Sequence, residues 1–256
     1  MSETNEAPIN PMRAAQAHMR PEPVRRFYKT AEATEEDGRF VLSLDGRRAR
    51  TPGRNPLAHA SRALMARVAA EWERQRETID PAEMPLTRLL NSAIDGVAYT
   101  VAETRADILR YAGSDLLCYR AEEPDTLVAR QAHAFDPVLR WAADELGARF
   151  NLAAGVMHVA QPAEAVAAIG AALEAYDDPA VLAALSSMTT LTGSAVLALA
   201  VARGFLSPEA AWRAAHIDED FQAERWGLDS EAMARREGRS REFEAAATVF
   251  AVGRAV

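Results

Sequence analysis

The segment IDEDFQAERWG, residues 217–227, places three consecutive acids beside two aromatic residues. Carboxylates in such a setting can act as general acids or bases, coordinate a metal ion, or accept hydrogen bonds from a partner protein. The alternative without any such role is the charged surface of a helix. The residues around the acids help to separate these possibilities.

Helix geometry puts the middle acid in a different environment from its neighbours, since successive residues are turned by about 100°. Asp218 and Asp220 are expected to reach water, whereas Glu219 falls within an apolar stripe. The other members of this stripe are Trp212, Ala215, Ala223 and Trp226. The opposite side of the helix, which is expected to face the core, carries Ile217, Phe221 and Leu228. An acid in an apolar stripe costs free energy unless it is paired, protonated or partly wet.

Two interpretations of Glu219 follow from that cost. It forms an internal ion pair with one of the many arginines, or it is a recognition carboxylate, framed by Gln222 and Trp226, that awaits a donor on a partner. A catalytic carboxylate would also need a second acid or base nearby in space. An enzyme that uses the carboxylates of residues 217–227 for acid/base chemistry is therefore the alternative function.

Other catalytic signatures are missing from the sequence. The five histidines never stand four residues apart, and there is no HExxH, GxGxxG, GxxxxGK[ST] or GxSxG motif. The single cysteine, Cys118, excludes an intramolecular disulfide and is expected to be a small buried hydrophobe. We therefore expect no metal, no cofactor and no catalytic residue.

The composition narrows the classes of partner and the compartment. The chain of 256 residues has 29 basic and 37 acidic side chains, so its net charge of 29 − 37 = −8 disfavours nucleic acid and anionic lipid. The uncharged segment 179–202 is long enough to cross a bilayer, but its serines and threonines favour a helix buried in a protein core. Residues 1–24 contain four prolines and no apolar run typical of a signal peptide. We expect a flexible arm there, and a cytoplasmic protein without membrane insertion.

Two Asp-Gly pairs, at 37–38 and 45–46, stand between short runs of β-prone residues. Such pairs are typical of tight hairpin turns, and they predict three antiparallel strands within residues 25–52. Alternation puts two sets of side chains on opposite faces: Phe40, Leu42 and Leu44 toward the core, and Val41 and Ser43 away from it.

The remainder of the sequence has helical periodicity. Leu64, Val68 and Trp72 repeat at intervals of four residues, which predicts a helix with Trp72 as its core anchor. Further helices are expected near 101–113, 124–147, 161–175, 180–203, 207–225 and 229–250. The predicted fold class is α+β, with a small antiparallel β-rich N-terminal domain followed by a larger all-helical domain. The expected parts are a flexible arm at 1–24, the β-rich domain with one helix at 25–80, and the helical domain at 81–256.

Several blocks of the sequence resemble one known protein family, in the same order. They are RRFYK at 25–29, LDGRRARTP at 44–52, AAEWERQ at 69–75, MPLTRLLNSAID at 84–95, YAGSDLLCYRA at 111–121, QAHAFDPVLRW at 131–141, and the acidic block at 217–227. The chain resembles bacterial-type members of the assembly chaperones of the F1 sector of ATP synthase, which act on the alpha subunit. The block at 84–95 is the most specific of these matches.

The resemblance implies a chaperone without a catalytic reaction. It would bind the unassembled alpha subunit, prevent its aggregation until the beta subunit pairs with it, and be a monomer when free in the bacterial cytoplasm. The resemblance also implies an important acid in the block at 217–227, where the alignment favours Glu219 and leaves Asp218, Asp220 and Glu224 open. The implied client-binding residues are Glu219, Gln222, Trp226 and Asp220. A helical scaffold without a client is a third interpretation.

Overall fold

The computed structural model describes residues 24–155, 157–227 and 230–252. The arm expected at 1–24, except its last residue, and the expected core residue Leu228 lie outside the described residues. The strands are β1 Ala31–Glu36, β2 Arg39–Leu44, β3 Arg47–Arg48, β4 Ala58–His59, β5 Tyr119–Arg120 and β6 Ala153–Ala154. The α-helices are α2 Arg62–Glu73, α3 Pro85–Asp95, α4 Val101–Ala112, α5 Asp125–Trp141, α6 Ala163–Leu173, α7 Pro179–Thr192, α8 Ala195–Ala202, α9 Pro208–Ala215, α10 Ile217–Trp226 and α11 Ser230–Val252. Short helical turns are η1 Pro81–Glu83, η2 Val97–Tyr99, η3 Leu116–Cys118 and η4 Ala142–Leu146.

The small antiparallel sheet confirms the hairpins that the Asp-Gly pairs predict. Asp37 and Gly38 have φ angles of 52° and 74°, and Asp45 and Gly46 have φ angles of 49° and 76°. Both central residues of each turn are thus left-handed, as a tight hairpin with twisted strands requires. The sequence did not predict β4, which pairs with β2 beside β3 and makes β2 the central strand.

Burial of the central strand β2 agrees with the expected alternation on one face only. Leu42 and Leu44 are buried, and Phe40 packs against the same core while half-buried. Val41 and Ser43 were expected to face away from the core, yet both are buried as well. Neither face of β2 is open to solvent near its C-terminal end.

The sheet region is joined to the helical region by a buried carboxylate. Glu71 of α2 accepts hydrogen bonds from the backbone N–H groups of Leu86 and Thr87, both at 2.8 Å, at the start of α3. Burial raises the pKa of Glu71, although these bonds to the ionised form oppose the shift. Trp72, the expected anchor, is half-buried and donates from its indole N–H to the Thr87 hydroxyl at 3.1 Å. One continuous apolar core contains residues of both regions, so the domain boundary near residue 80 stays a prediction.

The uncharged segment 179–202 forms the centre of the helical region as two helices rather than one. Gly193, with φ of 69°, ends α7, and the Ser194 hydroxyl then caps α8 by accepting from the Leu197 N–H at 2.9 Å. Every residue of α8 is buried. Within the described residues, no helix is long and apolar enough to span a membrane.

The helix expected at 207–225 is also divided, at His216. This residue is buried, and its ring lies 3.9 Å from that of Trp212, with Nδ1 placed 2.8 Å from the Trp212 carbonyl oxygen. The backbone of His216 leaves helical geometry, with φ of −116° and ψ of 20°, so α9 ends and α10 begins. Trp212 and Glu219 therefore do not share one helical stripe, which corrects the expectation from a single helix.

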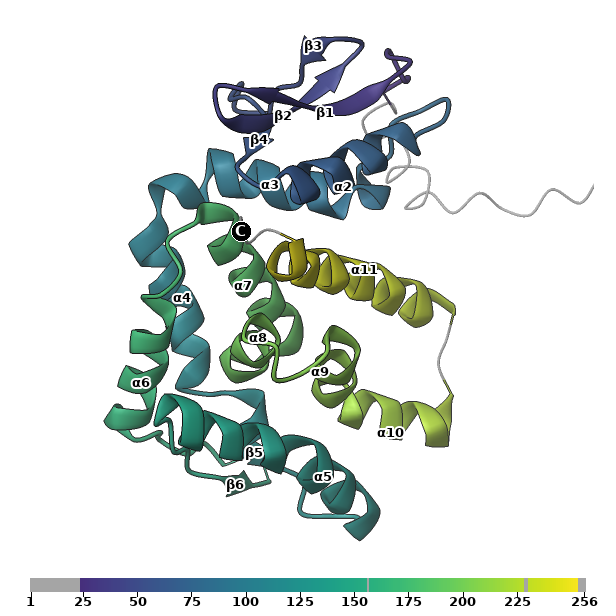
Figure 1. Ribbon diagram of the computed structural model, residues 1–256. Coiled ribbons are helices and arrows are strands. Elements are labelled where there is room, and N and C mark those ends of the chain that lie inside the picture. Colours follow the sequence, from purple (N-terminus) through teal and green to yellow (C-terminus); the bar gives the residue numbers. More distant parts are fainter. Residues whose placement is uncertain (1–23, 156, 228–229, 253–256) are drawn as a thin grey trace, which may run out of the picture.

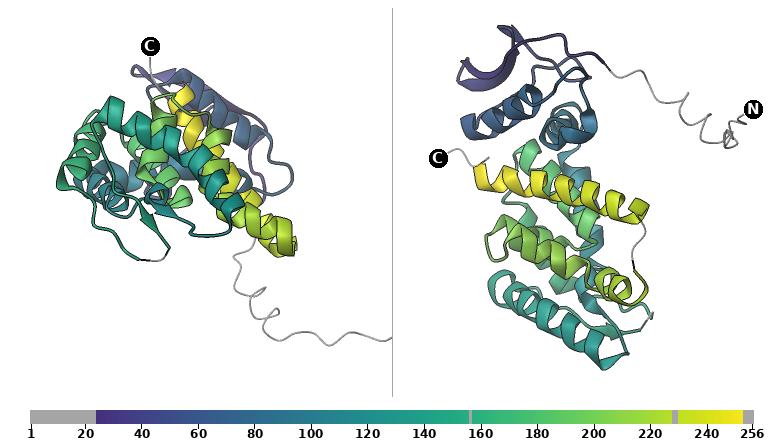
Figure 2. Two further views of the ribbon diagram at one scale, coloured as in Figure 1. Left: turned by 90° about the horizontal axis from the view of Figure 1, so that it is seen from below. Right: turned by 90° about the vertical axis from the view of Figure 1, so that its right-hand side faces the viewer.

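The helices are stacked between the sheet at one end and α5 at the other (Figure 1). The right-hand view of Figure 2 shows α11 lying between α2 and α3 on one side and α9 and α10 on the other. Contacts of α11 with α2 and α3 bring the C-terminal helix against the N-terminal part of the chain, and α11 also packs on α7. The small antiparallel sheet and the helical remainder confirm the α+β fold class.

Candidate functional site

The acidic block forms one wall of a cleft of about 400 Å³ between α10 and α11. From α10 and its end come Glu219, Gln222, Ala223, Trp226 and Gly227, and from α11 come Ala232, Arg235, Arg236 and Arg239. Three of the four expected client-binding residues thus line one cleft. The fourth, Asp220, lies beside it and forms an ion pair with Arg236.

Polar contacts to α5 hold most of α10 in place. Its one buried residue is Phe221, and the guanidinium groups of Arg130 and Arg225 lie over the Phe221 ring at 5.4 Å and 4.3 Å. Asp218 accepts a hydrogen bond of 2.7 Å from the amide of Gln131, and Glu224 pairs with Arg130 at 2.8 Å. Hydrogen bonding to Arg130 lowers the pKa of Glu224. These two acids of the block therefore attach α10 to α5.

The arginines that line the cleft differ in how closely they are paired. Arg235 is 2.6 Å from Glu231, and Arg236 is in direct contact with Asp220, whose hydrogen bond raises the pKa of Arg236. Arg239 is 3.9 Å from Glu219, a distance at the limit of an ion pair. The Glu219 side chain is 55% exposed, so it is partly wet, which is one of the conditions under which an apolar stripe can hold an acid. Glu219 does form an ion pair within the chain, with Arg239, but the pair is long and exposed to solvent.

Trp226 stands out among the four tryptophans. It is 86% exposed at the end of α10, where Gly227, with φ of 77°, ends the helix. Trp141 is buried, and Trp72 and Trp212 pack against the core. A tryptophan left in water at the edge of a cleft is typical of a surface that another molecule covers.

Sequence reasoning missed the three arginines of the cleft. Their spacing in ARREGR, at 235, 236 and 239, does place them on one face of a helix. What it could not give is how α11 packs against α10. When the packing angle and contact point of two helices are unknown, the residues that line a cleft between them cannot be predicted.

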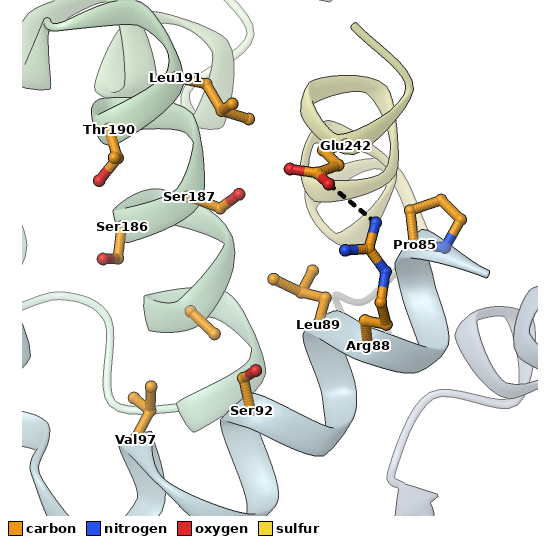
Figure 3. A pocket seen from close by; sticks show the side chains of 11 residues that line it. Pro85, Arg88, Leu89, Ser92, Val97, Ser186, Ser187, Thr190, Leu191 and Glu242 are labelled. Atoms are coloured by element: carbon orange, nitrogen blue, oxygen red, sulfur yellow. Dashed lines mark hydrogen bonds and ion pairs between the residues drawn. The ribbon is translucent and has the colours of Figure 1, made fainter. Parts of the chain in front are cut away.

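A second cleft, of about 370 Å³, lies between α3, α7 and α11 (Figure 3). Arg88 of α3 donates to Glu242 of α11 at 2.8 Å on one side of it, and the hydroxyl groups of Ser186, Ser187 and Thr190 lie along α7. Part of the wall comes from the block at 84–95. This cleft has one acid and one base, already paired with each other.

Neither a metal-holding cluster nor an ionised thiol is found in the part of the chain that the structure describes. No group of three or more His, Cys, Asp or Glu side chains there is arranged to hold a metal ion. Cys118 is buried as expected, and burial raises the pKa of its thiol to about 12. Such a thiol stays protonated and unreactive at neutral pH.

Comparisons with known proteins decide the family. The model of a family described as ATP12 chaperone protein matches residues 25–143. The solved structure of Atp12 from Paracoccus denitrificans is 40% identical, with 90% of this chain and 99% of that chain covered and a TM-score of 0.83. The chain belongs to the ATP12 chaperone family. This confirms the resemblance to F1-sector assembly chaperones drawn from the sequence blocks.

Two more relatives are similar to most of this chain. The Atu1473 protein of Agrobacterium tumefaciens is 48% identical, with 96% of this chain and 92% of that chain covered and a TM-score of 0.87. The mitochondrial protein atp12 of Schizosaccharomyces pombe is 24% identical over 215 residues, which are 79% of this chain and 74% of the relative. The ATP12 family model itself ends before the cleft between α10 and α11, so the role of that cleft has to be argued from its own geometry.

Proposed function

We propose that this protein binds the unassembled alpha subunit of F-type ATP synthase in the cytoplasm and prevents its aggregation until the beta subunit pairs with it. Membership of the ATP12 chaperone family supports a chaperone role. The blocks that resemble alpha-specific assembly chaperones support the choice of client. The protein would act as a monomer and release its client without a chemical reaction.

We place the client contact at the cleft between α10 and α11. The observation that carries this choice is the exposure of Trp226, at 86%, on the same face of α10 as the exposed carboxylate of Glu219. Tryptophan contributes strongly to protein interfaces because it buries a large area at low entropic cost. Gln222 lies between the two and adds an amide. Asp220 would act indirectly, by holding Arg236 in the wall of the cleft.

No observation favours the alternative of an acid/base enzyme. Among the residues described as lining this cleft, Glu219 is the only carboxylate. Asp218, Asp220 and Glu224 are bound to Gln131, Arg236 and Arg130 respectively. A proton-transfer pair needs two groups that face a common substrate position, and these acids face different partners.

Binding of purified alpha subunit tests both the client and the surface. We expect the wild type to suppress light scattering by unfolding-prone alpha subunit, and to leave the beta subunit unprotected. Trp226→Ala should weaken binding of alpha by at least about 30-fold, equivalent to about 2 kcal/mol for an interface hot spot. Tyr99→Ala is the matched control, because Tyr99 is an aromatic side chain that is 75% exposed outside the cleft. Equal protection of beta would contradict the client, and equal binding by both variants would contradict the surface.

A further inference from the structure

The four charged side chains that line the α10–α11 cleft are not equally satisfied. The Glu219 carboxylate accepts no hydrogen bond from any residue that the structure describes, and its one ion pair there, with Arg239, is 3.9 Å long. Arg235 and Arg236 each have a carboxylate within close contact. The group in the cleft with the most to gain from a new partner is therefore the Glu219 carboxylate.

We propose that this cleft receives a cationic side chain of the client, a guanidinium or an ammonium group, and that Arg239 holds its place in the free protein. This inference rests on the proposed function for the identity of the client only. The present position of Arg239 shows that a guanidinium can approach Glu219 without leaving the cleft wall.

Loss of the ion pair with Glu219 should cost little free energy, because two other contacts hold the Arg239 side chain. Its Nη2 donates to the Leu191 carbonyl oxygen at 2.9 Å, and its guanidinium carbon lies 6.0 Å from the centre of the Trp212 ring. Both contacts anchor Arg239 to neighbouring helices and do not involve Glu219. An exposed pair at 3.9 Å contributes little, since water screens both charges. The pair is thus exchangeable.

The other described basic groups beside Glu219 are held by other carboxylates or are neutral. Arg235, which lines the same cleft, pairs with Glu231 at 2.6 Å, and the charge of Glu219 is only a minor contribution to the raised pKa of Arg236. Arg236 is held by Asp220, and the burial of His216 lowers its pKa, which keeps this imidazole neutral at neutral pH. The cleft has an aromatic wall as well as a carboxylate, since Trp226 lies seven residues after Glu219 on the same helix face. Carboxylate and indole together are suited to a cation, by charge and by the electron-rich ring face.

A set of four variants separates this inference from a simple change of charge. Arg239→Gln removes the internal cation, and we expect it to bind purified alpha subunit up to about fivefold more tightly than the wild type. Arg235→Gln removes the same charge from the same cleft but leaves Glu219 paired as before, so it should not tighten binding. Glu219→Gln should weaken binding at least about tenfold, and the double variant with Arg239→Gln should be as weak as Glu219→Gln alone.

A second arm needs no alpha subunit. The indole N–H resonance of Trp226 is followed by NMR while acetylarginine amide, or its neutral analogue acetylcitrulline amide, is added. Arg239→Gln should respond to the arginine probe at a severalfold lower concentration than the wild type, and Glu219→Gln should not respond. The citrulline probe should have no effect.

The two arms give distinguishable outcomes. If Arg239→Gln binds alpha more weakly than the wild type, or if the arginine and citrulline probes act alike, the inference is overturned. If the wild type fails to bind the alpha subunit while the arginine probe still acts on Arg239→Gln at a lower concentration than on the wild type, the proposed client is wrong and the cation site is supported. Thermal unfolding of each variant confirms that the comparison is made between folded proteins.

Discussion

Helices α8 and α10 lie close in the sequence but are held by opposite means. All the residues of α8 are buried in the core, whereas α10 has one buried residue, Phe221. Ile217, at the start of α10, packs against the core while half-buried, and the polar contacts of α10 are ion pairs and hydrogen bonds to α5 and α11. Figure 1 shows α8 within the helical stack and α10 at its edge.

This difference indicates which contacts of a chaperone a client can replace without unfolding it. Apolar burial cannot be exchanged for a client's groups without opening the core, and it contributes about 25 cal/mol for each Å². Exposed polar pairs contribute little because water competes for both partners, so a client can replace them at small cost. A well-packed core thus supports an edge whose contacts are easily replaced.

The largest effect should come from the core side of this comparison. Leu199→Ala, in the middle of α8, should lower the free energy of unfolding by about 2–5 kcal/mol, because it removes buried contacts and leaves a cavity. Urea denaturation followed by circular dichroism measures this loss. Leu152→Ala is the control, since Leu152 is exposed and its truncation should cost less than about 0.5 kcal/mol. Similar losses in the two variants would show that α8 is less well packed than its burial indicates.

A pH effect should come from the buried carboxylate that supports α8. Asp115 is fully buried and accepts from the backbone N–H groups of Leu117 and Val196 at 3.1 Å, and burial raises its pKa to about 6. Between about pH 4 and pH 6 the folded state then holds a proton that the unfolded state releases. Stability from this group is complete below the unfolded pKa and is lost as the pH rises through about 6, by on the order of 3 kcal/mol. Asp115→Asn should remove this slope from the stability profile.

Asp95→Asn is the control with the opposite sign. Hydrogen bonds from Thr51, Asn55 and Gly53 lower the pKa of Asp95. Its contribution is present at neutral pH and is lost as the pH falls through the lowered value. The Asn variant should therefore change the profile below about pH 4 and leave the range from 4 to 6 unaltered. A wild-type slope that persists in Asp115→Asn would show that another group titrates there.

Features that depend on neighbouring residues could be predicted from the sequence, whereas features that depend on contacts between distant segments mostly could not. The hairpins follow from two Asp-Gly pairs, which act on their own neighbours. Strand β4 has only two residues, and the Pro52-Gly53 turn signal before it does not say which strand it joins, so only its pairing with β2 defines it. The break at Gly193-Ser194 had a local signal that the long apolar run outweighed, whereas the break at His216, whose ring contacts Trp212 four residues earlier, has no Gly or Pro to mark it.

The same rule explains what could be predicted of the cleft. Glu219, Gln222 and Trp226 share a face because they are three and seven residues apart on one helix, and that much is local. Their exposure and their arginine neighbours depend on how α11 returns against α10. The expected stripe through Trp212 failed for a different reason, because the helix breaks at His216.

An intermediate effect should appear at Asp218, where the sequence suggested little. Asp218→Ala leaves the amide of Gln131 without its acceptor, and Gln131 is buried. An unpaired buried donor costs about 1–3 kcal/mol, which urea denaturation would detect. Asp218→Asn keeps an acceptor oxygen at the same place and should cost less than the alanine variant. Equal stability of the alanine variant and the wild type would show that water replaces the lost acceptor.

The smallest effect on stability should come from Glu219→Gln, although the effect on client binding should be large. The Glu219 side chain is 55% exposed and its partner Arg239 is 3.9 Å away, so the loss of charge should change the free energy of unfolding by less than about 0.5 kcal/mol. Glu237→Gln is the matched control, because Glu237 is an exposed acid of α11 that pairs with Arg241 at 3.5 Å and does not line the cleft. Denaturation curves of the two variants should coincide, while alpha-subunit binding should fall only for Glu219→Gln. A loss of several kcal/mol on Glu219→Gln would instead make this residue part of the fold, and the contrast between α8 and α10 would then not hold at the cleft.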